Sequence, residues 1–548
     1  MLFRSVTTRT FDGAGNCLSM TYPGGRVVQY SYDVLDQVAS VSSGAGGLPS
    51  TSLARYQYDG PGRMARILRA NGSNTRIRWD GLQNPPNAPD DHGWLQVAGV
   101  SHTGFAGAVV IDQRRFTYDQ KQNKTTREQV TEFVVGQGTL TNRWSYDPLN
   151  QLTRAINTKG NGSIARAYHL DAEGNRLEVT NGPVVEFYTR DATFPIPADF
   201  QVNQYTTTPF GNEFHDNNGN RVQVAGAGGQ LLYTYDYADR LVFVFDLSSG
   251  FAAPVVSFTY DALGERISKT TYPPAPSLPV TTYFVYCGDP GADDGDGCAG
   301  SSAAITVSPL RRNNRPVFTA IETRTGGPSG GVDHGYCYAG KFGLIPGAHR
   351  DDSLATPVTV ARFSAAGLLE YYFHCDDLGS TLALTDAGGN VLERCEYDEF
   401  GAPQFLTSDG TPTSATASVH GNPFLFHGME WDGETGLYYD RSLYQDPKTG
   451  GSLSRGITRS VPRNLQGIRL RSAQNAGREK MKGTTGNPHG DAHLATQFNC
   501  EIGGVLRGGI HQVEGLTSQH DRVKFEFAVT PYKDGEANEM RSRPGCRR

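Results

Sequence analysis

The sequence predicts an all-β protein, in which many short antiparallel strands form one long wound surface. The first observation is a Tyr-Asp dipeptide, usually followed within a few residues by Gly or Arg, that together with its variants recurs at steps of 20 to 26 residues along much of the chain. The second is the composition, with 66 Gly, 30 Pro and only 37% hydrophobic residues, which is typical of strands joined by tight turns. A repeated unit of this kind determines the architecture more strongly than any single motif.

Each repeat predicts one strand, a Gly/Asn turn and a second strand, because apolar and polar positions alternate on both sides of the dipeptide. The dipeptides are Tyr32-Asp33, Tyr58-Asp59, Tyr118-Asp119, Tyr146-Asp147, Tyr235-Asp236, Tyr260-Asp261 and Tyr397-Asp398. Variants of the unit stand at Phe11-Asp12, Trp79-Asp80, Asp171 to Asn175 and Asp216 to Asn220.

The dipeptide has a structural role that its residue types explain. We expect the tyrosine ring to pack on a neighbouring strand. The aspartate can accept backbone N–H bonds in the turn, where Gly or Asn supplies the left-handed residue. Arg240 and Arg266 are expected to pair with an aspartate of the adjacent repeat. Aspartates that recur this often are scaffold residues and not catalytic ones.

Four segments follow in order: repeats over 1–282, a loop-rich interruption over 283–350, a resumed pattern over 351–455 and a basic tail over 456–548. The interruption contains Asp293, Asp294 and Asp296, whose carboxylates are of the type that calcium prefers. Their spacing is not that of an EF-hand loop, so we favour a solvated acidic loop and keep calcium as the alternative.

The segment 351–455 contains the most specific patterns of the chain. A hairpin is predicted around the Asp-Ala-Gly-Gly-Asn turn at 386–390. Two further signatures flank it, His374-x-Asp376-x-Leu378-Gly379-Ser380 before it and Gly436-Leu437-Tyr438-Tyr439 after it.

With these signatures, the chain resembles the Rhs/YD-repeat proteins and their Rhs-associated core. That family includes bacterial polymorphic toxins, insecticidal toxin-complex C components and, more distantly, teneurins. The resemblance implies a ribbon that spirals into a partial hollow shell, with the core as a plug. It implies that the shell encloses a variable C-terminal polypeptide as cargo, that an immunity protein and secretion-system components are partners, and that the protein is secreted or lies at the bacterial surface.

The chain departs from the family where members cleave themselves with a pair of core aspartates. Asp446 matches the first aspartate, but the second position holds Gly456, and no Asp-Pro follows Asp446-Pro447. Two close carboxylates can share a proton and act as acid and base, so this chemistry needs both. We therefore predict no aspartate autoproteolysis and a turn role for Asp446.

The tail is basic, with 16 Lys and Arg against 9 Asp and Glu over 451–548. It occupies the position of a toxin domain in the family, and its charge would suit a nuclease that acts on phosphate backbones. His489, Asp491 and His493 can hold a divalent metal, which is the one cofactor considered for the chain. The alternatives are an exposed polar turn at these residues and a disordered tail read through from a frameshift.

Other bulk features exclude several classes of protein. The net charge of -6 indicates no general nucleic-acid or membrane binding, and no apolar run reaches the roughly 18 residues of a membrane helix. The N-terminus has no signal-peptide core and enters a repeat at once, so upstream sequence is expected. The eight cysteines form no Cys-x-x-Cys pair; free thiols are favoured, with Cys375 facing Cys395 across strands as the alternative.

The function predicted from these observations is a non-enzymatic shell that encloses and helps deliver a C-terminal effector. An adhesion or carbohydrate-binding repeat protein and a degenerate fragment without an active effector are the alternatives. A third alternative is an enzymatic one, in which the tail is a metal-dependent nuclease.

Overall fold

The computed structural model describes most of residues 8–454, and nothing beyond Ser454. The ranges are 8–23, 25–45, 51–82, 92–105, 109–132, 138–193, 204–226, 229–261, 264–274, 276–288, 318–325, 332–337, 359–364, 367–440 and 443–454, with only the backbone described at 45, 285–288, 318–325, 332–337, 359–364 and 367–368. The chain divides into two compact units, Met1–Ala476 and Gly477–Arg548, and every described residue belongs to the first.

The first unit begins with a sheet of fifteen antiparallel strands, each paired with the strands before and after it in sequence. The strands are β1 (Thr8–Phe11), β2 (Cys17–Thr21), β3 (Arg26–Tyr32), β4 (Val38–Ala45), β5 (Thr51–Tyr58), β6 (Met64–Arg69), β7 (Asn74–Trp79), β8 (Val97–Thr103), β9 (Val110–Tyr118), β10 (Lys124–Gln129), β11 (Leu140–Tyr146), β12 (Leu152–Lys159), β13 (Gly162–Leu170), β14 (Arg176–Asn181) and β15 (Val184–Phe187). Burial alternates along β3 as the sequence predicts.

A second sheet, also of fifteen strands in sequence order, continues the meander. Its strands are β16 (Thr207–Thr208), β17 (Gly211–His215), β18 (Arg221–Gly226), β19 (Gly229–Tyr235), β20 (Leu241–Asp246), β21 (Ala253–Tyr260), β22 (Arg266–Thr271), β23 (Val280–Gly288), β24 (Phe318–Thr325), β25 (Val332–Cys337), β26 (Thr359–Ser364), β27 (Gly367–Cys375), β28 (Thr381–Thr385), β29 (Val391–Tyr397) and β30 (Pro403–Thr407). The hairpin predicted around 386–390 is β28–β29. Strands β24 and β25 carry the sheet through 283–350, where the sequence indicated an interruption.

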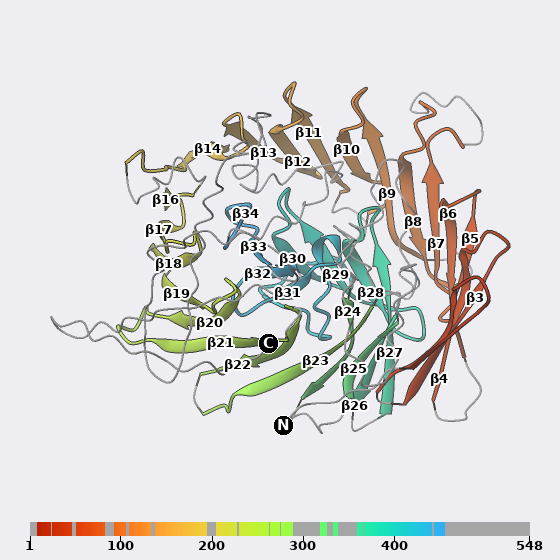
Figure 1. The fold of residues 1–548 in the computed structure, drawn as a ribbon. Coiled ribbons are helices and arrows are strands. Elements are labelled where there is room, and N and C mark those ends of the chain that lie inside the picture. The colour runs from red at the N-terminus through yellow and green to blue at the C-terminus, as the bar shows by residue number, and fades with distance from the viewer. Residues whose placement is uncertain are drawn as a thin grey trace, which may run out of the picture. The chain divides into compact units, whose positions relative to one another are not determined.

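A small sheet completes the described part of the unit. It consists of β31 (Glu430–Asp432), β32 (Leu437–Asp440), β33 (Leu443–Asp446) and β34 (Gly451–Ser452), and follows one turn of 3-10 helix, η2 (Phe426–Gly428). Figure 1 shows the strands of the two large sheets following one another around the unit, with β31–β34 on their inner side.

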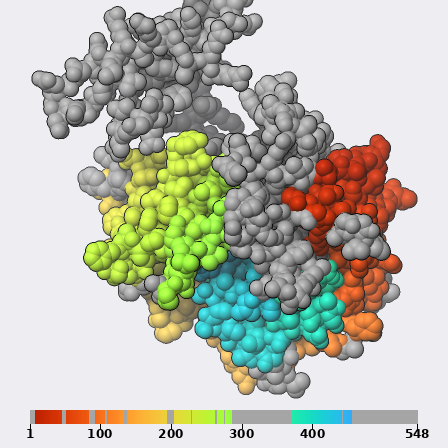
Figure 2. Space-filling model, turned by 90° about the horizontal axis from the view of Figure 1, so that it is seen from below, coloured from red at the N-terminus to blue at the C-terminus, as the bar shows by residue number. Residues whose placement is uncertain are grey.

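Two apolar clusters show how these parts pack. One combines Tyr30 and Tyr56 of the first sheet with Phe373 and Leu384 of the second. The other combines Val244 and Val256 of β20 and β21 with residues of the small sheet. In Figure 2 the teal surface of the second sheet likewise lies against the red and orange surface of the first. The C-terminal strands therefore pack back onto sheets formed much earlier in the sequence.

The predicted fold class is confirmed, since the described residues are nearly all antiparallel β-structure in long wound sheets. Among these residues no helix has the length and apolar character needed to span a membrane. The tail predicted at 456–548 lies outside the described residues.

Candidate functional site

The aspartates of the repeats organise the turns that join the strands. In the complete turns, Oδ1 accepts the backbone N–H groups two and four residues later, at 2.8–3.0 Å. This pattern occurs at Asp33, Asp119, Asp147, Asp236 and Asp398. Asp261 accepts the later of the two bonds, and the backbone of Asp59 closes its turn with Arg63. The aspartates thus lie in turns, bonded to the backbone.

Each repeat tyrosine fastens its turn to the preceding repeat through its hydroxyl group. The hydroxyl donates to a backbone carbonyl at 2.6–2.9 Å in all seven dipeptides. The donors and acceptors are Tyr32 to Cys17, Tyr58 to Val38, Tyr118 to Val97, Tyr146 to Lys124, Tyr235 to Arg221, Tyr260 to Leu241 and Tyr397 to Thr381. Except for Val97, every acceptor lies five residues after the aspartate of the preceding turn. The dipeptide therefore joins consecutive repeats.

The arginine pairing predicted from the sequence was wrong in both cases. Arg240 forms its ion pair with Asp236 of its own turn, at 2.6 Å, and reaches the next turn only through the carbonyl of Asp261. Arg266 forms its ion pairs with Glu430 and Asp432 of the small sheet, and not with an aspartate of the adjacent repeat. Short side chains four residues after the aspartate make the contacts between turns instead, as Asn123 does with Asn150 at 2.9 Å.

The first core signature forms another such turn, with a histidine buried ahead of it. Asp376 accepts the N–H groups of Leu378 and Ser380 at 2.9 and 2.8 Å, and Gly379 has the left-handed φ of 85° that the turn requires. His374 is fully buried and contacts Thr385 through Nε2 at 2.9 Å.

The second core signature contributes a loop and two buried tyrosines. Gly436, with φ of 72°, closes the turn ahead of Leu437. The hydroxyl of Tyr438 donates to the carbonyl of Gly401 at 2.7 Å, and the hydroxyl of Tyr439 accepts the N–H of Arg266 at 3.0 Å. Both signatures thus hold the C-terminal strands in place.

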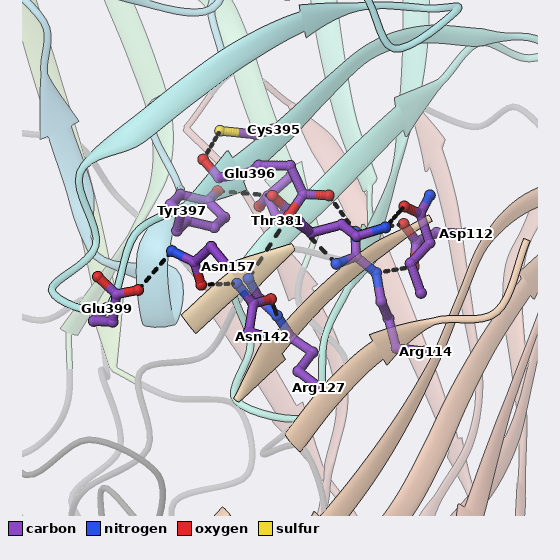
Figure 3. Close-up of polar contacts among 12 residues, drawn as sticks. Asp112, Arg114, Arg127, Asn142, Asn157, Thr381, Cys395, Glu396, Tyr397 and Glu399 are labelled. Carbon is purple, nitrogen blue, oxygen red and sulfur yellow. Dashed lines mark hydrogen bonds and ion pairs between the residues drawn. The ribbon is translucent and has the colours of Figure 1, made fainter. Parts of the chain in front are cut away.

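The core strands meet the first sheet through buried ion pairs, shown in part in Figure 3. Arg114 of β9 is bound by Asp112 of its own strand and by Glu396 of β29. Lys124 pairs with Asp377 at 2.7 Å, with both side chains 4% exposed. Charges this deep are expensive to bury unless they are paired, so these contacts fix where the core lies.

Glu399, which follows β29, makes a further buried contact with the first sheet. It accepts Asn157 of β12 and Arg166 of β13, both at 2.7 Å, and the hydroxyl of Tyr168 at 3.1 Å. Burial by itself raises the pKa of Glu399, but Arg166 and Asn157 outweigh it, and the pKa lies below its ordinary value. The carboxylate is therefore held in its charged form by partners from the first sheet.

The small sheet meets the second sheet in the same way. Arg266 of β22 contacts Glu430 at 2.6 Å and Asp432 at 2.5 Å, and Lys269 contacts Asp432 at 2.8 Å. Burial favours the neutral form of Asp432, yet the Arg266 and Lys269 charges lower its pKa below the ordinary value. Burial is the larger effect at Glu430, whose pKa is raised. The surroundings therefore favour the charged form of Asp432 and disfavour that of Glu430.

Asp446 forms a turn and an ion pair. Its Oδ1 accepts the N–H of Lys448 at 3.0 Å, and its Oδ2 contacts Arg221 at 3.0 Å. Arg221 also binds Glu213 at 3.2 Å. Gly456, the position of the second aspartate in the family, lies outside the described residues, so the absence of autoproteolysis stays a prediction.

Several other expected sites also fall outside the described residues. They are the acidic loop with Asp293, Asp294 and Asp296, and the metal site of His489, Asp491 and His493. Within the described ranges no cluster of His, Cys, Asp and Glu is arranged to hold a metal ion. Cys375 and Cys395 are both buried free thiols, and burial raises the pKa of Cys375 to about 12.

Comparison with known proteins fits this arrangement. The RHS Repeat family model matches residues 11–48, which include the turns of Asp12 and Asp33 and the bond from Tyr32 to Cys17. The chain therefore contains an RHS repeat at these residues. It is 26% identical over 428 residues to the tRNA3(Ser)-specific nuclease WapA of Bacillus spizizenii and to the tRNA nuclease WapA of Bacillus subtilis, which covers 78% of the chain and 14% of each relative. It is 36% identical over 80 residues to the putative uncharacterized protein YibJ of Escherichia coli, or 15% of the chain and 31% of YibJ.

Among solved structures, the chain is similar in fold to the TcdB2–TccC3 complex. The TM-score is 0.59 at 16% identity, over 85% of this chain and 21% of the solved chain. A Tc holotoxin pore of Photorhabdus luminescens gives the same TM-score, identity and coverage. The chain therefore spans a small part of the proteins that it matches.

The residues that hold the core, above all Arg114, Arg266 and Glu399, were not singled out from the sequence as core anchors. Each of them has a partner more than 160 residues away, and no local pattern encodes such a pairing. The one available signal was the occurrence of arginine at strand starts next to the repeat turns, as at Arg266.

Proposed function

We propose that the described residues form the shell of a toxin-type RHS-repeat protein, and that this shell holds the C-terminal segment 455–548 as its cargo. One observation carries this proposal: the chain reaches its last described residues while still buried. Leu453 is 1% exposed, and its carbonyl accepts the N–H of Arg221 at 2.7 Å. The segment that follows starts from the inner contact between the small sheet and the second sheet.

The ion pairs of the core support the same proposal. Asp446, Asp432 and Glu430 all lie on the small sheet, and each is bound by an arginine of the second sheet. A sheet held by several buried pairs gives the following segment a fixed starting point, which a shell around a cargo needs. The cost of leaving any of these charges unpaired keeps the small sheet from detaching.

The similarity to WapA and to the TcdB2–TccC3 fold supports a toxin-related role. WapA is named as a tRNA nuclease and TccC3 is part of a toxin complex, and these properties belong to those proteins. For this chain we propose that the basic segment 455–548 is the effector and that the protein is secreted or reaches the bacterial surface. An immunity protein and components of a secretion system would then be its partners, and a nucleic acid would be the substrate if the segment is a nuclease.

Growth assays test the proposal directly. The full chain, residues 1–454 and residues 455–548 are induced separately in Escherichia coli, and the integrity of tRNA and DNA is measured. We expect the isolated segment to stop growth and cleave nucleic acid, and the full chain to do neither. If the segment is harmless and leaves tRNA and DNA intact, the effector role is wrong, and the adhesion and degenerate-fragment alternatives gain support. We also expect the purified full chain to keep its intact mass, since it lacks the second aspartate.

A further inference from the structure

Two buried histidines lie where the first and second sheets meet. His102 stands on β8, His374 stands on β27, and their ring centroids are 5.2 Å apart at an interplanar angle of 77°. The two residues are 1% and 0% exposed. Their strands are about 270 residues apart in the sequence. The contact between the two rings therefore joins the first sheet to the second.

The hydrogen bonds of His102 suit a neutral ring. Its Nε2 contacts the carbonyl of Cys375 at 2.9 Å, and a carbonyl only accepts, so Nε2 carries the proton. In the neutral ring, Nδ1 accepts from the hydroxyl of Thr75, 2.7 Å away. The oxygen of Thr75 in turn accepts from Arg69 at 2.7 Å. A second proton on His102 would make Nδ1 a donor to Thr75, whose oxygen already accepts from Arg69, and would place a cation beside the Arg69 guanidinium.

The surroundings of His374, like those of His102, do not suit a protonated ring. Its Nε2 contacts Thr385 at 2.9 Å, and the same hydroxyl accepts from Asn71 of the first sheet at 2.9 Å. Its Nδ1 is buried without a hydrogen-bond partner among the described residues. A protonated ring would therefore bury an N–H without an acceptor, which is costly in a dry interior.

The charged groups around the pair are almost all positive. Arg69 of β6 faces both rings, Arg114 of β9 acts on His102, and Arg394 of β29 acts on His374. Asp112 lies directly opposite His102 on β9, but both of its carboxylate oxygens are bound by Arg114, at 2.7 and 2.8 Å. Glu396 also pairs with Arg114. No described carboxylate is left to compensate a proton on either ring.

We propose that His102 and His374 form an acid-sensitive clasp between the two large sheets, which is closed while both rings are neutral and opens when they are protonated. This proposal does not depend on what the C-terminal segment does. Burial, followed by the Arg69 charge, lowers the pKa of His102 to about 3, and burial lowers that of His374 well below its ordinary value. At pH 5 each ring would favour the open contact by roughly 30-fold, because an exposed imidazole has its ordinary pKa of about 6.5.

The thiol of Cys375 reports on this contact, because it follows His374 and is 4% exposed. The full chain is treated with 4,4'-dithiodipyridine at pH 7.5 and pH 5.0, and labelling of each cysteine is followed by peptide mass spectrometry. Rates are divided by those of the denatured chain at the same pH. Cys395, which is buried in a separate apolar cluster, is the internal reference against global unfolding.

We expect Cys375 labelling to rise at least tenfold at pH 5.0, while Cys395 changes much less. The double variant His102→Asn, His374→Gln keeps polar atoms near the original ones and should show less than a twofold rise. The exposed His169 provides the matched control, since His169→Gln should behave like the wild type. No acid-induced rise in the wild type, or an equal rise in the double variant, would overturn the proposal.

A second variant decides the matter if the double variant does not fold at pH 7.5, as judged by circular dichroism. Arg69→Met removes the positive charge that acts most strongly on both rings and replaces it with an apolar side chain of similar length. We expect it to reduce the acid-induced rise in Cys375 labelling at pH 4.0 at least twofold relative to the wild type, because removing this charge raises the pKa of the buried rings and a proton on either ring then costs less. A rise equal to that of the wild type would show that the histidine cluster does not control the contact.

Discussion

Arg266 on β22 is bound to Asp432 on β31 at 2.5 Å, across 166 positions of sequence, and the two side chains are each 1% exposed. Glu430 completes the pairing of the guanidinium at 2.6 Å. This contact joins the small sheet to the second sheet and is the clearest example of how the C-terminal strands are held.

The variant Asp432→Asn is expected to lower the free energy of unfolding by about 3 kcal/mol, because it leaves Arg266 and Lys269 with less compensating charge in the interior. Urea denaturation followed by tyrosine and tryptophan fluorescence measures this loss. The matched control is Glu434→Gln, which removes the more exposed partner of Lys269 and should cost less than about 1 kcal/mol. Equal effects of the two variants would contradict the role given to the buried pair.

The tyrosine of each repeat is expected to contribute through its hydroxyl as well as its ring. Tyr58→Phe keeps the ring but leaves the carbonyl of Val38 without its donor, which lies 2.9 Å away. The expected cost is about 1 kcal/mol in the free energy of unfolding. Tyr237→Phe is the control, since Tyr237 is 91% exposed and should change stability by less than about 0.5 kcal/mol. Identical stabilities would show that the hydroxyl bond contributes nothing.

Substitutions at Gly13 and Gly15, which lie in the same turn, distinguish the effect of backbone strain from the effect of packing. A Cβ added at Gly13 or at Gly15 would meet nothing within 4 Å, but Gly15 has φ of 91° and Gly13 does not lie in the left-handed region. Gly15→Ala should therefore cost about 1 kcal/mol, and Gly13→Ala should be neutral or slightly stabilising. Thermal unfolding of both variants tests this. A larger loss for Gly13→Ala would contradict the turn geometry.

The repeat architecture could be predicted from the sequence because its determinants are local. Tyr32 and Asp33 stand beside the turn that they build, and the alternation of Arg26 to Tyr32 is visible within seven residues. The sequence also predicted the hairpin at 386–390. These features follow from short-range hydrogen bonds and the two-residue period of a strand.

The packing of the core could not be predicted, because it depends on partners far apart in sequence. Arg266 was expected to pair with a neighbouring repeat, and only the folded chain brings it to Asp432. The stretch 283–350 looked like a break because of its Gly and Asp content, yet strands β24 and β25 continue the ladder through it. Composition indicates where loops are long, and it does not show where the sheet resumes.

His427 gives a pH dependence of defined sign. It is half-buried, has a left-handed φ of 54°, and its N–H donates to Ser380 at 3.2 Å. Burial, followed by the charge of Lys124, lowers the pKa of His427 to about 4. Because the unfolded state then binds the proton more strongly, the contribution of His427 to stability is complete above about pH 6.5 and falls as the pH decreases towards 4.

The variant His427→Asn removes this contribution and suits the left-handed backbone, since asparagine tolerates that region. Between pH 7.5 and 4.5 the wild type should lose about 1 to 2 kcal/mol more stability than the variant, after allowance for the partial exposure of the ring. Urea denaturation at both pH values gives the difference. A variant that loses as much as the wild type would show that this ring does not titrate with folding.

Limited digestion by trypsin tests most directly the proposal that the shell holds the segment 455–548. The segment contains 16 lysines and arginines, so an accessible segment offers many cleavage sites. Digestion of the full chain is compared with that of the isolated segment, and cleavage is followed by peptide mass spectrometry. We predict that these sites in the full chain are cut at least tenfold more slowly than in isolation, and that Asp432→Asn abolishes part of this protection. Cleavage of the segment at the isolated rate, while residues 8–454 stay intact, would contradict the claim.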